Sequence, residues 1–184
     1  MIPTEELKQE HEGILLMLKI LDRVATKIES GEEADAAHLE KMVEFLRVFA
    51  DRCHHGKEED LLFPAMEKAG IPRERGPIGV MLMEHEEGRG HIRKMADALA
   101  RNRKGEAAAM KDFARGARQY FDLLTQHIQK ENQVLFPMGD RVLSQDVQAK
   151  LAEGFEKIEE ERIGKGTHER FHRLLEELEE KYLK

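Results

Sequence analysis

A short phrase with the chemistry of a metal site occurs twice in this sequence. The first copy runs from His54 to Glu58 and the second from His127 to Glu131, and each is followed by Leu-Phe-Pro at the same distance. A spacing of four residues places both side chains on one face of a helix. An imidazole and a carboxylate offered side by side are typical metal ligands, so the repetition predicts two halves of one metal site.

Two further helices carry a matching histidine. The segment Glu10-His11-Glu12 is similar to Glu84-His85-Glu86, and the lone histidine precedes its His-x-x-x-Glu pair by 43 residues in the first half and by 42 in the second. The chain therefore contains two similar helical hairpins. If they pack with approximate two-fold symmetry, six side chains reach one level of the core. These candidate ligands are His11, His54, Glu58, His85, His127 and Glu131.

Long amphipathic helices must position these residues. Apolar residues at three- and four-residue steps predict helices over about 4–30, 35–68, 78–102 and 106–138. Short connections between them predict an all-α fold, an up-down-up-down four-helix bundle over residues 1–140. Residues 141–184 are predicted to add a C-terminal helical extension packed on the bundle. Thr4 is the predicted cap of the first helix, and Pro64 and Pro137 are expected to kink the last turns of their helices.

Composition narrows the class of protein. A net charge of −7 shows no basic footprint for nucleic acid. No stretch approaches the ~20 apolar residues of a membrane helix, and we see no signal peptide. Cys53 is the only cysteine, so no intramolecular disulfide can form and a reducing compartment is favoured. We therefore expect a soluble, cytoplasmic protein that binds neither nucleic acid nor membrane.

The donor set indicates which metal would bind. Four imidazoles and two bridging carboxylates would give each of two ions two nitrogens and two oxygens. This mixture suits iron or manganese, with zinc as the alternative. Two glutamates buried in an apolar bundle would be costly without a cation.

The order His, His-x-x-x-Glu, His, His-x-x-x-Glu, with Leu-Phe-Pro after each pair, resembles the hemerythrin-like (HHE cation-binding) family over about residues 5–140. The resemblance implies a non-haem di-iron centre, oxo- or hydroxo-bridged, that meets dioxygen, nitric oxide or peroxide. It also implies that the four histidines are terminal iron ligands and that Glu58 and Glu131 are the bridging carboxylates.

Two departures from the oxygen-carrying hemerythrins matter. Those proteins have a further histidine one turn after the third-helix ligand, where this chain has Arg89. They also end on His-x-x-x-x-Asp, whereas in this chain the fifth residue after His127 is Asn132 and the carboxylate, Glu131, comes one residue earlier. The four-His, two-Glu set is more similar to the iron-centre repair branch, which is linked to nitrosative stress and iron–sulfur cluster repair. We therefore expect a di-iron protein that binds or reduces a small oxidant, as an oxidoreductase if it turns over. A sensor or metal-binding module without turnover is the alternative, and the sequence does not identify a redox partner.

Other residues allow a second interpretation. His55 and Glu59 share the four-residue spacing but are rotated by roughly 100° from the first pair, and the Leu-Phe-Pro alignment favours His54 and Glu58. Cys53 is expected to be a buried, inert thiol, with a redox role as the alternative. His168 and His172 are expected to lie at the surface or pack, with an extra ligand role as the alternative. His91 is predicted not to bind metal, and Tyr120 is expected to pack, with a hydrogen bond near the site as the alternative.

Overall fold

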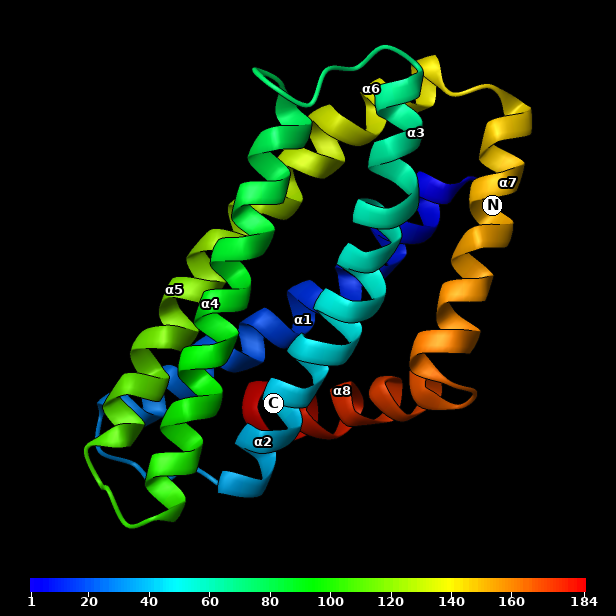
Figure 1. Ribbon diagram of the computed structural model, residues 1–184. Coiled ribbons are helices and arrows are strands. Elements are labelled where there is room, and N and C mark those ends of the chain that lie inside the picture. The colour runs from blue at the N-terminus through cyan, green and yellow to red at the C-terminus, as the bar shows by residue number, and fades with distance from the viewer.

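The protein is all-helical in the computed structural model, which describes residues 1–184 (Figure 1). The first helix of the bundle is α1 (Pro3–Glu29) and the third is α4 (Pro77–Arg103). The second is one long helix made of α2 (Ala36–Phe45), π-helical segments over Leu46–His55 and Glu58–Leu62, and α3 (Phe63–Lys68). The fourth joins α5 (Ala109–Lys130), a π-helical turn over Glu131–Leu135, and α6 (Phe136–Val142). After the bundle follow α7 (Gln145–Ile158), a π-helical turn over Glu159–Ile163, and α8 (Thr167–Leu183).

The four long helices form the predicted up-down-up-down bundle. Helix α5 packs between α1 and α4, and α4 in turn contacts the second long helix. Helix α7 returns along the side of the bundle beside α1, and α8 crosses α1 near the α2 end (Figure 1). The fold class read from the sequence, a four-helix bundle with added C-terminal helices, is confirmed.

One predicted helix cap is wrong. The N-cap of α1 is Ile2 and makes no side-chain hydrogen bond, since Pro3 opens the helix. The Thr4 hydroxyl instead donates to Asp140 Oδ1 at 2.7 Å, which ties the start of α1 to the end of α6. The C-terminal end agrees with expectation, because Gly31 follows α1 in the left-handed region at φ 83°.

The prolines of the repeated phrase act differently from the predicted simple kink. Pro64 and Pro137 each stand in the first turn of a short α-helix that directly follows a π-helical turn. Proline has no N–H, and its ring collides with the carbonyl one turn earlier, so a wider preceding turn relieves the conflict. Glu58 and Glu131 are the first residues of these wide turns. The repeated phrase therefore specifies both a carboxylate and the local backbone that presents it.

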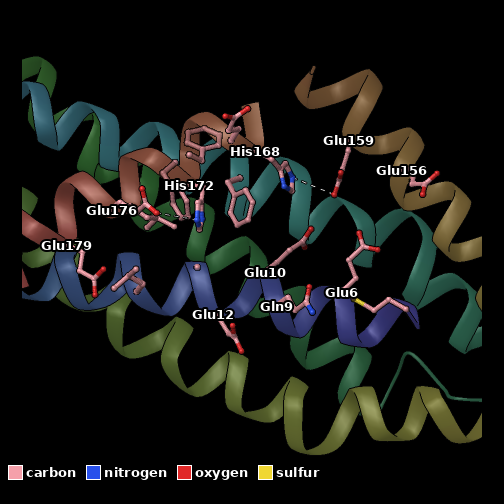
Figure 2. A pocket seen from close by; sticks show the side chains of 18 residues that line it. Glu6, Gln9, Glu10, Glu12, Glu156, Glu159, His168, His172, Glu176 and Glu179 are labelled. Atoms are coloured by element: carbon pink, nitrogen blue, oxygen red, sulfur yellow. Dashed lines mark ion pairs between the residues drawn. The ribbon is translucent and has the colours of Figure 1, made fainter. Parts of the chain in front are cut away.

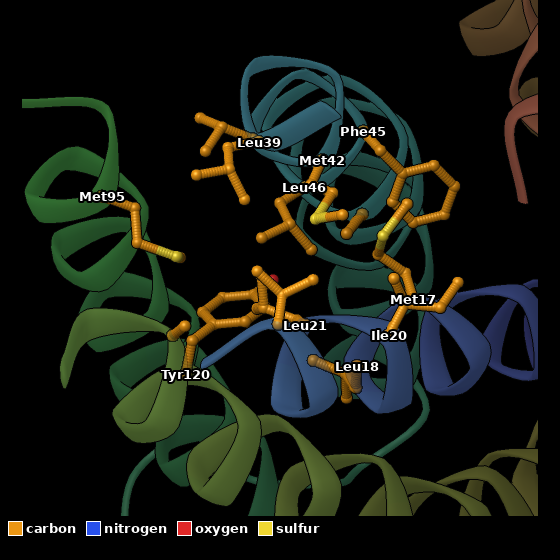
Figure 3. Packing of buried hydrophobic residues seen from close by; sticks show 14 of the residues in the cluster. Met17, Leu18, Ile20, Leu21, Leu39, Met42, Phe45, Leu46, Met95 and Tyr120 are labelled. Atoms are coloured by element: carbon orange, nitrogen blue, oxygen red, sulfur yellow. The ribbon is translucent and has the colours of Figure 1, made fainter. Parts of the chain in front are cut away.

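Two apolar clusters fill the bundle and leave a polar layer between them. The larger lies toward the α2 end and contains Met17, Leu21, Leu46 and Tyr120 (Figure 3). The smaller lies around the two Leu-Phe-Pro segments. Its bundle residues include Leu7, Leu62, Phe63, Leu135 and Phe136. Helix α8 contributes to the larger cluster and α7 to the smaller, so the C-terminal helices bury apolar surface on both sides of the polar layer.

Candidate metal centre

The six predicted ligands meet in the polar layer. All of their side chains are at most 1% exposed, although four are histidines and two are glutamates. They come from all four long helices, as the two-hairpin repeat predicts. They are His11 on α1, His54 and Glu58 on the second helix, His85 on α4, and His127 and Glu131 on the fourth.

The four imidazoles form two pairs, one in each half of the site. His11 Nε2 lies 2.9 Å from His54 Nε2, and His85 Nε2 lies 3.1 Å from His127 Nε2. Every Nε2 therefore points into the layer. Each pair presents two nitrogen donors to one point, which is what a metal ion bound by two histidines requires.

Each carboxylate reaches both imidazole pairs. Glu58 Oε1 lies 3.4 Å from His54 Nε2, while its Oε2 lies 3.2 Å from His85 Nε2. Glu131 Oε2 lies 3.1 Å from His11 Nε2, and its Oε1 lies 3.1 Å from His127 Nε2. The two oxygens of each glutamate thus face different halves of the site, as a bridging carboxylate must.

The donors fit a pair of cations. All four carboxylate oxygens of Glu58 and Glu131 are buried and accept no hydrogen bond. The only polar groups that face these oxygens are the imidazoles, and two ionised carboxylates buried together cost several kcal/mol unless cations pair with them. Nitrogen and oxygen donors that converge on one buried layer, with no other partner for the oxygens, are the signature of a metal site.

Hydrogen bonds from the outer ring nitrogens orient the first imidazole pair. The Nδ1–H of His11 donates to Asn132 Oδ1 at 2.7 Å, and that of His54 donates to Glu10 Oε2 at 2.7 Å. An acceptor on Nδ1 fixes the tautomer in which Nε2 carries the free lone pair. Neither acceptor was predicted from the sequence.

In the second pair, the corresponding residues of the repeat lie beside both imidazoles but accept a hydrogen bond from only one of them. His85 Nδ1–H donates to Glu59 Oε2 at 3.1 Å. His127 Nδ1 lies 3.5 Å from Glu84 Oε1 and makes no hydrogen bond. Glu84 precedes His85 as Glu10 precedes His11, and Glu59 follows Glu58 as Asn132 follows Glu131. The internal repeat was the available signal for these supports, because each stands directly beside a predicted ligand.

His55 and Glu59, the alternative His-x-x-x-Glu pair, both contact the His85 imidazole. The His55 ring stacks on His85 with centroids 3.8 Å apart, and its Nδ1–H donates to Asp51 Oδ1 at 3.2 Å. A donor atom of His55 also lies within 4.8 Å of donors of Glu58, His85 and His127. Glu59 therefore supports His85, while His55 brings one more imidazole next to the second half of the site.

Arg89 stands where the resemblance to oxygen carriers would place another histidine. Its guanidinium donates to Asp51 at 2.9 Å and also to Glu59, the residue that accepts from His85. Arginine has no acceptor lone pair and stays protonated, so it offers nothing to a metal ion. It holds the surroundings of His85 in place instead.

The other singled-out residues lie outside the six-residue layer. Cys53 is buried with its Sγ 3.8 Å from His168 Nε2. Burial raises the pKa of the Cys53 thiol to about 12, which favours the inert thiol. His172 is exposed beside Glu176, 3.5 Å away. Tyr120 packs in the larger apolar cluster, and His91 lies 3.6 Å from Glu87 at the edge of α4.

Charges in the metal-free site are strongly coupled. Burial alone would lower the pKa of the His54 imidazole, but the negative charges of Glu58 and Glu10 outweigh it and raise the pKa to about 10. Burial would raise the pKa of the Glu131 carboxyl, yet the charge of His127 and the imidazole nitrogens of His11 and His85 that face it hold this pKa well below its usual range. Protons on the imidazoles thus balance the carboxylates in the absence of a metal ion.

This coupling predicts opposite pH dependences for the metal-free and metal-loaded proteins. The raised pKa of His54 contributes stability that is fully present below about pH 6.5, the ordinary value, and is lost as pH rises through about 10. Metal ions instead compete with protons for the same nitrogens, so loading strengthens as pH rises. We expect the free energy of unfolding of metal-free protein to fall from pH 7 to 10, whereas that of loaded protein rises from pH 5 to 7. Urea denaturation with and without chelator measures both, and a metal-free protein with constant stability from pH 7 to 10 would contradict the coupling.

No helix in residues 1–184 combines the length and the apolar character needed to cross a membrane.

Comparison with known proteins agrees with this geometry. Residues 2–139 match the hemerythrin HHE cation binding domain. An uncharacterised protein of Mycobacterium tuberculosis is 25% identical over 160 residues, which is 87% of this chain and 62% of that protein. The iron-sulfur cluster repair protein YtfE of Edwardsiella ictaluri is 29% identical over 137 residues, 72% of this chain and 61% of its own length. A probable iron-sulfur cluster repair protein of Haemophilus influenzae is 31% identical over 127 residues, 66% of this chain and 55% of its length.

The chain thus spans about three fifths of the length of the curated relatives it matches. The matched region contains all six residues of the buried layer and ends before α7. The family match and the converging imidazole and carboxylate donors point to the same kind of site. The chain belongs to the hemerythrin HHE cation binding domain family.

Proposed function

We propose that this protein holds two iron ions in the buried layer and uses them to bind or reduce a small oxidant. His11 and His54 would hold one ion, His85 and His127 the other, and Glu58 and Glu131 would bridge the two. The observation that carries the proposal is the pair of buried carboxylates, each reaching both imidazole pairs while accepting no hydrogen bond.

The chain's own residues prepare this site. Acceptors on the Nδ1 atoms of His11, His54 and His85 fix the imidazoles with Nε2 inward. Apolar clusters on both sides of the layer limit the access of water. Iron, when bound, supplies one-electron redox chemistry toward dioxygen, nitric oxide or peroxide that these side chains lack.

Two observations favour an oxidant-reacting or repair-type centre over reversible oxygen transport. Arg89, at the position of the extra histidine of oxygen carriers, is paired with Asp51 and Glu59 and supplies no ligand. Two relatives carry names that specify iron–sulfur cluster repair. We therefore assign the proposed di-iron centre of this chain to reactions with a small oxidant, with nitric oxide or peroxide as candidate ligands beside dioxygen.

Reduction and reoxidation of the iron-loaded protein test the proposal. Anaerobically reduced protein is mixed separately with dioxygen, nitric oxide and hydrogen peroxide in the presence of excess reductant, and oxidant consumption is followed with the optical spectrum. We expect consumption of many equivalents per protein for at least one oxidant. One stoichiometric spectral change would assign a sensor or binding module instead. Colourless protein that is purified with zinc and does not take up iron would overturn the proposal.

A further inference from the structure

We propose that the C-terminal segment, residues 141–184, supports the metal centre, because it positions the ligand His54 through a series of ion pairs. This series of ion pairs runs from Glu159, in the π-helical turn after α7, through Lys57 to Glu10. The inference rests on the proposed function, since His54 must bind a metal ion for its position to matter. It assigns a role to residues beyond the matched family region 2–139.

Lys57 is at the centre of this series of ion pairs. Its side chain is 0% exposed, and its ammonium donates to Glu10, to Glu159 Oε1 at 2.5 Å and to Glu6 Oε1 at 2.8 Å. A buried ammonium is costly unless it is fully paired, so Lys57 and its carboxylates fix one another. Glu10 uses its other oxygen, Oε2, to accept from His54 Nδ1. A displacement at Glu159 therefore reaches the metal ligand through two ion pairs and one hydrogen bond.

The sequence repeat provides an internal comparison. Lys130 occupies the position of Lys57 in the second half of the repeat, and it pairs with Glu84 as Lys57 pairs with Glu10. Lys130 is 45% exposed, and no carboxylate of the C-terminal segment contacts it. The Nδ1 atom of its histidine, His127, lies 3.5 Å from Glu84 and makes no hydrogen bond. The half that lacks a C-terminal cover thus has the looser support.

Helix α7 and the turn after it create the difference in burial. The Phe155 ring lies 5.4 Å from Lys57 Nζ and shields it from water. Glu6, Glu10 and Glu159 line one groove of about 950 Å³. Figure 2 shows these three side chains close together, with Glu6 and Glu10 on α1 and Glu159 after α7. His168 on α8 lies 3.5 Å from Glu159 and bounds the same groove. The second half of the bundle has no equivalent of this cover.

If a substitution interrupts this series of ion pairs, we expect weaker metal binding. Removing a residue that supports a metal-ligating histidine typically lowers metal affinity by about 10–100-fold. We expect Glu10→Gln to lower the metal affinity by an amount within that range. Glu159→Gln acts two contacts further away, so we expect an increase of about 10-fold in the rate at which a chelator removes the first-half metal.

Two readouts independent of activity test this. The first is the rate of iron release to a chelator. The second is the His54 Nδ1–H signal in the proton NMR spectrum of zinc-loaded protein, which is diamagnetic. Glu159→Gln and Lys57→Met should accelerate release and speed exchange of that proton with water. Matched controls are Glu156→Gln, on the same groove, and Lys130→Met, the equivalent of Lys57, and both should leave the His54 signal unchanged.

The outcomes separate the inference from the proposed function. Glu159 is 33% exposed, so Glu159→Gln should fold even if Lys57→Met does not. Wild-type release rates and an unchanged His54 signal in Glu159→Gln would overturn the inference alone. Full metal content in His54→Ala would overturn the proposed ligand set, and the inference with it.

Discussion

Replacing Glu58 or Glu131 with alanine is expected to abolish tight binding of both metal ions. Each carboxylate reaches both imidazole pairs, so one substitution removes an oxygen donor from each ion at once. Metal analysis of purified variants, followed by iron titration, measures the loss. We expect less than one ion per chain after purification, compared with two for the wild type.

Glu59→Ala is the informative control for this prediction. The sequence alone predicts no loss of metal in this variant, because Glu59 belongs to the rotated His-x-x-x-Glu pair. The structure changes that expectation, since Glu59 accepts the hydrogen bond from His85 Nδ1. We expect two ions to bind with about 10–100-fold weaker affinity at the His85 half. A Glu58→Ala variant that keeps both ions, or a Glu59→Ala variant that loses both, would contradict the assignment of bridging roles.

Removal of the metal is expected to lower the melting temperature by roughly 10 °C. Ligand in about 1,000-fold excess over its Kd stabilises a protein by about 4 kcal/mol, and each kcal/mol moves the melting temperature of a protein of this size by about 2–4 °C. Without metal, Glu58 and Glu131 are also left as buried carboxylates balanced only by protonated imidazoles. Calorimetry with and without chelator measures the shift.

The same two glutamates provide a control for the melting experiment. Glu58→Ala removes one partner of buried ion pairs with His54 and His85, so the metal-free variant should melt below the metal-free wild type. It should also show almost no shift on chelation, because it binds little metal. Equal melting temperatures for wild-type protein with and without chelator would show that these residues do not form the metal site.

The helices and the six candidate ligands could be predicted from the amino-acid sequence. Both are local patterns: apolar residues recur at the helical period, and His54 and Glu58 share a helix face because they are four residues apart. The hairpin repeat extended this reasoning to His11 and His85. Two similar units that each offer half of a ligand set must meet to complete it.

The surroundings of those ligands could not be predicted from the sequence, because they depend on tertiary packing. The acceptors Glu10, Asn132 and Glu59 support histidines on other helices, and the pairing depends on how the helices face one another rather than on spacing within one helix. For the same reason, Thr4 does not cap α1 as predicted. Its hydroxyl instead donates a hydrogen bond to Asp140 on α6, a neighbouring helix. The cover over Lys57 arises because α7 and α8 fold back on the first half of a nearly two-fold bundle. The periodicity of a sequence specifies which residues share a helix face, whereas tertiary packing determines which residues of other helices contact that face.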